Sequence, residues 1–159
     1  MTTTGRYVAL DGVRLAWPPS EPVRVWAGGV GERTLAMLGD VAAGVLVDSG
    51  TSPARLHEIV ALVGDAARAS GRSDVPHVAL YVHAIRGADA RERLAAVFEP
   101  TGDLDTELGL AGDAAAIADG IGRYVAAGAE TVILRPPEDE PDIEGYATWV
   151  GAQVMPLLR

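Results

Sequence analysis

A glycine-rich turn at residues 27–31, Ala-Gly-Gly-Val-Gly, is the segment best suited to hold a ligand. It lies between the apolar run 23–26 and a segment, 35–41, whose apolar residues recur at helical spacing. Because glycine lacks a Cβ atom, Gly28 and Gly29 let a flat or phosphate-bearing cofactor approach the backbone, and the N-terminus of the following helix offers free N–H groups. The alternative is that these glycines only form a tight strand-to-helix turn.

His83 is the candidate for acid–base chemistry. It shares one face of an apolar strand with Tyr81 and Ile85, at the two-residue period of a strand. An imidazole that faces a ligand can donate a proton near neutral pH. The alternative is a hydrogen-bonded histidine of the core.

Asp48 and Ser49 follow a second apolar run, where ligands bind in parallel α/β folds. The loops 85–87 and 135–138 hold equivalent positions. Asp48 would repel a phosphate group, and the simpler interpretation is that Asp48 or Ser52 caps the next helix. The acidic run 138–140 is interpreted as a solvated loop.

The elements that must position these residues alternate between strand and helix. A two-residue turn at Asp11-Gly12 predicts a β-hairpin between 6–10 and 13–15, followed by a stiff, proline-rich connector. The expected strands are 23–27, 44–47, 77–85 and 131–134. The expected helices include one from the Ser52 cap to Gly71, then 88–98, 113–128 and 142–158, with an acidic loop over 100–109. This alternation allows an open doubly wound sheet or a segment of a barrel.

Composition narrows the class of protein. The chain has 159 residues, 48% of them apolar, which predicts one domain with a core of its own. A net charge of −9 disfavours nucleic acid and anionic membranes as partners. No apolar run is long enough to cross a bilayer, and Met1-Thr2-Thr3-Thr4 lacks a signal pattern, so a cytoplasmic location is expected. The chain has no cysteine and no metal-ligand spacing, so no metal site is proposed.

Three segments carry a resemblance to a known family. They are the lead-in from Gly5-Arg6-Tyr7 to Trp17-Pro18-Pro19, the Ala-Gly-Gly turn with its helix and GVLVDSG at 44–50, and the segment 112–134 that begins Gly-Asp and ends in TVIL. In order and spacing they resemble the luciferase-like monooxygenases, within them the branch that uses the deazaflavin coenzyme F420. The resemblance covers nearly the whole chain and matches the C-terminal half of the family's (β/α)₈ barrel.

The resemblance implies a fold class and a cofactor. The chain would be α/β, with four parallel βα units forming the C-terminal half of a TIM-type barrel at 23–159, after a small hairpin and proline-rich lead-in at 1–20. F420 or FMN would contact the turn formed by Ala27, Gly28, Gly29 and Val30. Asp48 and Ser49 would lie on the substrate side. Members that oxidise sugar phosphates use lysines there, and this chain has none.

The family's catalytic residues lie in the N-terminal half, which this chain does not contain, so catalysis and cofactor binding by the isolated chain are expected to be weak or absent. A half barrel would also expose an apolar concave face, which predicts a homodimer or a partner chain that supplies the missing half. The first hypothesis is therefore a truncated or split luciferase-like oxidoreductase. The alternatives are a non-catalytic half-barrel that binds or scaffolds, and a coding region that continues upstream of Met1.

Overall fold

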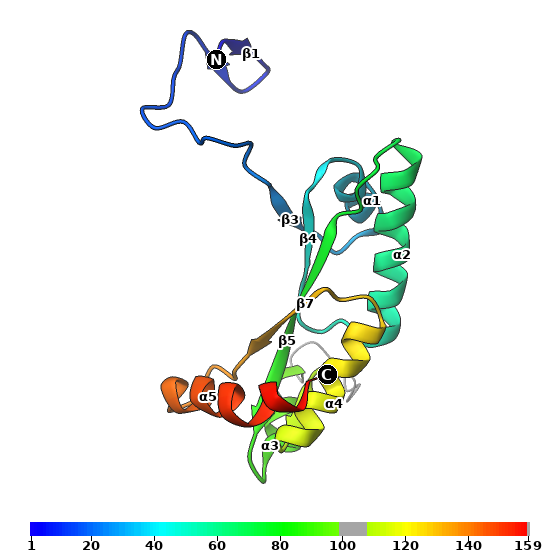
Figure 1. Ribbon diagram of the computed structural model, residues 1–159, viewed down its shortest axis with the longest axis vertical. Coiled ribbons are helices and arrows are strands. Elements are labelled where there is room, and N and C mark those ends of the chain that lie inside the picture. Colours follow the sequence, from blue (N-terminus) through cyan, green and yellow to red (C-terminus); the bar gives the residue numbers. More distant parts are fainter. Residues whose placement is uncertain (99–107, 159) are drawn as a thin grey trace.

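The computed structural model describes residues 1–98 and 108–158. Its centre is a parallel sheet formed by β3 (Trp26–Gly28), β4 (Gly44–Val47), β5 (His77–Arg86), β6 (Leu110–Gly112) and β7 (Thr131–Arg135). The predicted half-barrel architecture is confirmed, because β3, β4, β5 and β7 lie side by side in chain order and all run parallel (Figure 1). The acidic loop expected over 100–109 falls largely outside the described residues.

One strand was not predicted. β6 pairs with the last three residues of β5, beyond the stretch that pairs with β4 and β7. It has only three residues, Leu110–Gly112, and this is too short for an alternation of apolar and polar side chains to stand out in the sequence. Its pairing therefore depends on the length of β5 and not on a local pattern.

The helices are α1 (Glu32–Val41), α2 (Pro53–Ala69), α3 (Ala90–Phe98), α4 (Ala114–Ala126) and α5 (Ile143–Trp149), and α5 continues as a π-helical turn, Val150–Val154, and a short 3-10 helix, Met155–Leu157. Local signals predict the bounds of two helices, α2 and α4, whereas the α-helix expected over 142–158 ends at Trp149. Ser52 accepts a hydrogen bond from the Arg55 N–H at 3.2 Å and so caps α2. Gly71 and Gly128 follow the C-caps of α2 and α4 with φ of +78° and +109°, as expected for glycines that end helices.

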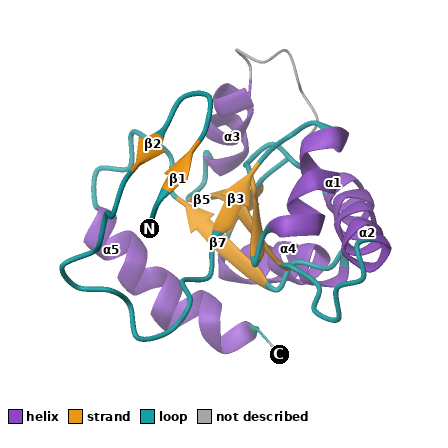
Figure 2. Cartoon of the chain, turned by 90° about the horizontal axis from the view of Figure 1, so that it is seen from above, coloured by secondary structure: helices purple, strands orange, loops and turns teal. Residues whose placement is uncertain are grey.

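The main core lies between the sheet and the helices on one side of it. Val45 and Val47 of β4, with Val78, Leu80 and Val82 of β5, point to this side and are almost fully buried. They pack against apolar residues of α1, α2 and α4, among them Leu35, Leu56, Val63, Ile117 and Tyr124. Figure 2 shows α1 and α2 at one edge of the strands, α5 at the other edge and α3 above them. Trp149 and Val150 of the last helical segment also pack against the main core.

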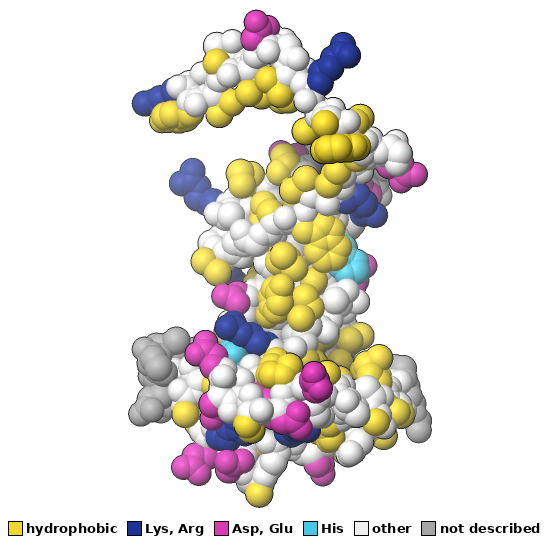
Figure 3. Space-filling view, turned by 90° about the vertical axis from the view of Figure 1, so that its left-hand side faces the viewer, with side chains coloured by type: hydrophobic (Ala, Val, Ile, Leu, Met, Phe, Trp, Pro, Cys, Tyr) yellow, Lys and Arg dark blue, Asp and Glu magenta, His cyan; other side chains and the backbone are white. Residues whose placement is uncertain are grey.

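The other face of the sheet is open. The register places Trp26, Leu46, Tyr81 and Ile133 on this face, opposite to the core residues of the same strands. Trp26 is 39% exposed and Tyr81 37% exposed. Figure 3 shows the apolar side chains as a band along the side turned away from α1 and α2. We call this surface the open face.

α3 covers the end of the open face nearest the C-termini of the strands. Ile85, at the end of β5, is fully buried there in a second small core with Ala90, Leu94 and Phe98 of α3. This core is separate from the main one, and its residues lie on the side of the sheet that the other helices leave free. The open face is therefore closed at one end by the chain itself.

The N-terminal hairpin differs from the prediction. β1 (Thr3–Thr4) pairs antiparallel with β2 (Ala9–Leu10), and the Gly5 N–H donates to the Val8 carbonyl at 2.7 Å, so the connection is 5–8. The hairpin expected at Asp11-Gly12 is wrong: Gly12, with φ of +65°, only turns the chain so that Val13 exchanges hydrogen bonds with Met1. Figure 1 shows this hairpin held away from the sheet by an extended connector.

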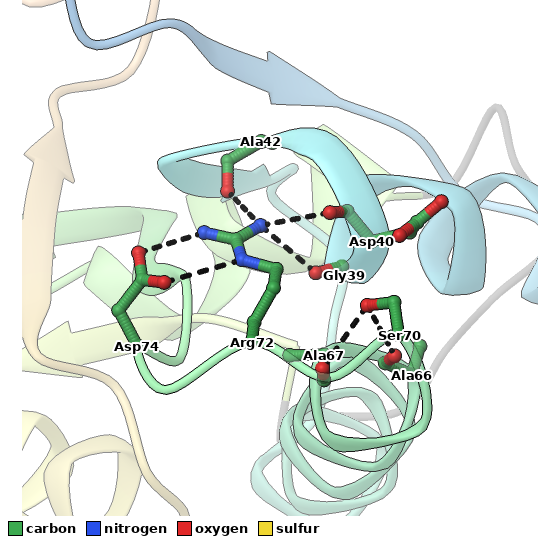
Figure 4. A network of polar contacts seen from close by, with 8 residues as sticks. All are labelled: Gly39, Asp40, Ala42, Ala66, Ala67, Ser70, Arg72 and Asp74. Carbon is green, nitrogen blue, oxygen red and sulfur yellow. Dashed lines mark hydrogen bonds and ion pairs between the residues drawn. The ribbon is translucent and has the colours of Figure 1, made fainter.

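Arg72 joins the end of α1 to the loop that follows α2. Its Nη1 donates to the carbonyl oxygens of Gly39, Asp40 and Ala42 at 3.0, 3.2 and 2.7 Å, as Figure 4 shows. The same guanidinium forms a bidentate pair with Asp74, which raises the pKa of Arg72 and lowers that of the carboxyl group. A cation at a helix C-terminus satisfies carbonyl groups that have no partner within the helix.

Candidate functional site

The residues expected to do chemistry gather at one end of the sheet. Because the strands are parallel, their C-terminal ends lie together, and this is where ligands bind in barrels and other parallel α/β folds. Gly28 ends β3, Asp48 follows β4, His83 is near the end of β5 and Arg135 ends β7. The register puts Gly28, His83 and Arg135 on the open face.

The glycine-rich turn divides between the two faces. The Ala27 side chain packs against the main core, whereas Gly28 lies on the open face, and Val30 is 81% exposed. A Cβ atom on Gly28 would lie 3.2 Å from the Leu46 carbonyl oxygen, and one on Gly29 would lie 2.6 Å from Cγ2 of Thr34. Neither glycine has a positive φ, so close approach explains them better than a left-handed turn.

α1 begins directly after this turn. Its N-cap, Gly31, provides no side-chain hydrogen bond to the first turn. The first-turn amide groups are therefore available to a ligand that lies against the turn, although the carboxylate of Glu32 in the same turn reduces the attraction for an anion. Gly28 and the start of α1 form one continuous stretch of backbone at the site.

Asp48 and Ser49 form a local turn at the end of β4. The Asp48 carboxylate accepts hydrogen bonds from the Ser49 N–H at 2.8 Å and from its hydroxyl at 3.5 Å, and the Thr51 hydroxyl donates to the Asp48 carbonyl at 3.0 Å. Of the two residues expected to cap α2, Ser52 does so. The Asp48 side chain is exposed and lies near enough to His83 to act on its charge.

His83 is 6% exposed and lies under α3. Its ring meets Phe98 edge to face, with 5.7 Å between centroids and 85° between planes. Its Nδ1 is buried and has no hydrogen-bond partner among the described residues. Burial and the positive charge of Arg135 lower the pKa of His83, against the opposing effects of Asp48 and Glu138, so the ring is neutral at neutral pH.

Three arginines near this end of the sheet form ion pairs that the sequence did not predict, although Arg86 and Arg135 lie in the candidate loops 85–87 and 135–138. Each faces one residue of the acidic run 138–140: Arg135 faces Glu138 at 4.0 Å, Arg93 faces Asp139 at 2.8 Å and Arg86 faces Glu140 at 3.0 Å. The solvated-loop interpretation is wrong for Glu140, whose side chain is only 5% exposed. Partners that are 46 and 54 residues apart leave no signal in the sequence.

Arg86 also fixes the start of α5. Its Nη1 donates to the Gly145 carbonyl at 3.1 Å, and its guanidinium lies over the rings of Tyr146 and Trp149. The Tyr146 hydroxyl donates to the Ala84 carbonyl at 2.9 Å. Burial and the nearby charge of Glu140 raise the pKa of Tyr146 to about 12, so this phenol remains a donor.

Two pockets open beside these ion pairs. One, of about 380 Å³, is bounded by His83, Arg93, Val97 and the loop 137–139. The other, of about 410 Å³, lies between Arg86, Asp113, Trp149 and Gln153. In the described part of the chain, no three His, Asp or Glu side chains come together as metal ligands. None of the described helices is long and apolar enough to cross a membrane.

Comparison with known proteins identifies the family of this chain. The family model of the luciferase-like monooxygenases matches residues 1–131. No curated protein sequence matches the chain.

Solved structures share the fold at low sequence identity. An F420-dependent secondary alcohol dehydrogenase in complex with an F420-acetone adduct aligns with 100% of this chain and 56% of its own, at a TM-score of 0.83 and 20% identity. The coenzyme F420-dependent tetrahydromethanopterin reductase of Methanopyrus kandleri aligns with 84% of this chain over 50% of its own length, with a TM-score of 0.65 and a sequence identity of 23%. The EDTA monooxygenase of Chelativorans sp. BNC1 aligns with 99% of this chain over 49% of its own length, with a TM-score of 0.72 and a sequence identity of 17%.

The chain spans about half the length of these proteins, and at these identities the likeness concerns the fold. The half-barrel sheet, the ligand-accessible ends of its strands and the match over residues 1–131 agree with one another. The chain belongs to the luciferase-like monooxygenase family.

Proposed function

We propose that this chain is one half of a luciferase-like oxidoreductase that uses F420 or FMN and becomes active only when a second half barrel closes over its open face. The second half is another copy of the chain or a separate partner chain. The observation that carries the proposal is the open face itself, with Trp26, Tyr81 and neighbouring apolar residues left uncovered on the side where a whole barrel has its interior.

Covering this face is energetically favourable. Removing a few hundred Å² of apolar surface from water contributes several kcal/mol at about 25 cal/mol/Å², before the costs of association. The lead-in adds to the uncovered surface, because Tyr7, Leu15 and Trp17 are 84%, 69% and 90% exposed. Exposed apolar side chains that lie together are characteristic of surfaces that meet another protein.

The residues at the strand ends fit a flavin or deazaflavin. Gly28 leaves the backbone open to a flat ring on the open face, and the first turn of α1 offers amide groups that have no side-chain cap. Bound there, either cofactor would supply hydride transfer to or from the substrate. Ala27, Gly29 and Val30 would complete the contact through their backbone, since the Ala27 side chain belongs to the core.

His83 and Asp48 would act on the substrate side. His83 is neutral and faces the same end of the sheet, so it can hold a proton or a hydrogen bond next to the reacting groups. Asp48 and Glu138 add negative charge there, and this favours a neutral or cationic substrate over a phosphorylated one. The second half would exclude water and complete the catalytic residues.

The test is cofactor binding by the chain alone and by an assembled complex. The purified chain is titrated with FMN and with F420 by fluorescence, before and after co-purification with the product of the neighbouring reading frame, and light scattering gives the mass of each species. We expect little or no binding by a monomer and stoichiometric binding by a complex or a dimer. Tight binding by a monomer would show that the second half is dispensable.

A different result would favour the alternative function. If the chain forms a stable dimer or complex that binds neither cofactor, the open face serves association only, and the chain is a non-catalytic half-barrel scaffold. The two outcomes differ in one measured quantity, the number of cofactor molecules bound per assembly.

A further inference from the structure

The pocket between α3 and the loop 137–139 lies entirely within this chain. Its volume is about 380 Å³, and His83 of β5, Arg93 and Val97 of α3, and the loop itself line it. The volume is sufficient for a small organic molecule and well above the size of a single water. It needs no second half barrel and no cofactor to exist.

The two nitrogens of His83 differ in their surroundings. Nδ1 is sealed from solvent and has no hydrogen-bond partner in the described residues, so only Nε2 can reach a molecule in the pocket. A hydrogen on Nδ1 would leave a buried donor unpaired, and orphaned N–H groups are rarer in proteins than orphaned acceptors. A neutral ring therefore carries its hydrogen on Nε2 and presents a donor to the pocket.

Each guanidinium near the pocket has a carboxylate beside it. Arg93 is paired with Asp139 at 2.8 Å, and Arg135, the register partner of His83, lies 4.0 Å from Glu138. Asp48, which follows the strand β4 on the other side of β5, adds a further negative charge. An anionic ligand would be repelled, whereas a neutral oxygen acceptor would meet the Nε2–H donor without a charge penalty.

We infer that this pocket binds a small neutral carbonyl or hydroxyl compound, whose oxygen accepts a hydrogen bond from Nε2 of His83 while its apolar part lies against Val97 and Pro137. The inference deepens the proposed function, because His83 is the residue placed there on the substrate side, and it concerns binding by the isolated chain. It stands or falls independently of whether any assembly binds F420 or FMN.

The experiment is an NMR titration of the ¹⁵N-labelled chain at pH 7.5. The long-range ¹H–¹⁵N spectrum of His83 shows which ring nitrogen carries the hydrogen. Cyclohexanone is the neutral probe and cyclohexanecarboxylate is its anionic counterpart. His83→Phe keeps an aromatic ring against Phe98 and removes the donor, and His57→Phe, at an exposed position of α2, is the matched control.

We expect hydrogen on Nε2, a saturable shift of the His83 ring signals with cyclohexanone, and weaker binding of the carboxylate. His83→Phe should weaken cyclohexanone binding by about two- to tenfold, the range of one neutral hydrogen bond, as followed by the methyl signals of Val97. His57→Phe should leave it unchanged. Hydrogen on the buried Nδ1 would overturn the inference, as would the absence of a saturable shift or tighter binding of the carboxylate. If His83→Phe does not fold, the position of the ring hydrogen and the shifts of the His83 ring signals in the unmodified chain still show whether the pocket binds cyclohexanone through Nε2.

Discussion

His83 and Arg135 are register partners on neighbouring strands, β5 and β7, and both lie on the open face of the sheet. The pair places a positive charge beside a buried imidazole, so burial and charge act in the same direction on the pKa of His83. Asp48 and Glu138 oppose the effect only partly. The neutral form of His83 is therefore the form that the fold accommodates.

The pH dependence of stability follows from this arrangement. Because the folded-state pKa of His83 lies below its ordinary value of 6.5, the unfolded chain binds the proton more readily, and stability falls as the pH drops below about 6.5. His83→Phe should reduce the loss of unfolding free energy between pH 7.5 and pH 5, measured by urea denaturation. The exposed-site variant His57→Phe should retain the full loss. If His83→Phe lost as much unfolding free energy between pH 7.5 and pH 5 as the unmodified chain, protonation of His83 would not be a cause of that loss.

Association should depend on the open face. Tyr81→Glu puts a carboxylate in the middle of the apolar band, where covering it would leave an unpaired charge. We expect it to weaken self-association or partner binding by at least about tenfold, by light scattering over a micromolar concentration range. Met37→Glu adds the same charge to a 55% exposed apolar position on α1, among the helices, and should have little effect. If the two substitutions weakened association equally, the open face would not be the surface through which the chain associates.

Cofactor binding should depend on Gly28. Gly28→Val adds a side chain on the open face, with its Cβ 3.2 Å from the Leu46 carbonyl oxygen, so the fold needs only a small adjustment while the ligand loses its approach to the backbone. We expect loss of FMN or F420 binding in the assembled complex, by fluorescence titration, with unchanged circular dichroism. Gly122→Val, where nothing lies within 4 Å of the added Cβ, serves as the control and should bind normally. Normal binding by Gly28→Val would exclude this turn as a cofactor wall.

The acidic run offers a matched pair of stability variants. Glu140→Ala removes the partner of Arg86 from a side chain that is 5% exposed, and should lower the unfolding free energy by about 2 kcal/mol. Glu138→Ala removes a carboxylate that is 92% exposed and 4.0 Å from Arg135, and should cost less than about 0.5 kcal/mol. Thermal and urea denaturation measure both. Similar losses for the two variants would mean that burial does not govern the strength of these pairs.

Several elements followed from the sequence because their causes are local. Ser52 and Asp113 cap helices through their own side chains, and Gly71 and Gly128 end helices through a backbone conformation that glycine adopts without strain. The parallel strands were predictable because their apolar runs lack the alternation of a half-buried strand, and the same runs leave apolar side chains on the open face. The fold class and the side of β5 that carries His83 followed from these periodicities and from the family resemblance.

The tertiary structure decided what depends on residues far apart in the chain. β6 pairs with the part of β5 that extends beyond its other partners, and the N-terminal hairpin turns at 5–8, with Met1 and Val13 bonded to each other. Asp139 and Glu140 of the acidic run pair with arginines of distant elements, and His83 is a buried histidine against Phe98 beside Arg135. Hydrogen bonds within one turn are set by neighbouring residues, whereas burial and long-range charge pairs arise only when the sheet brings distant segments together.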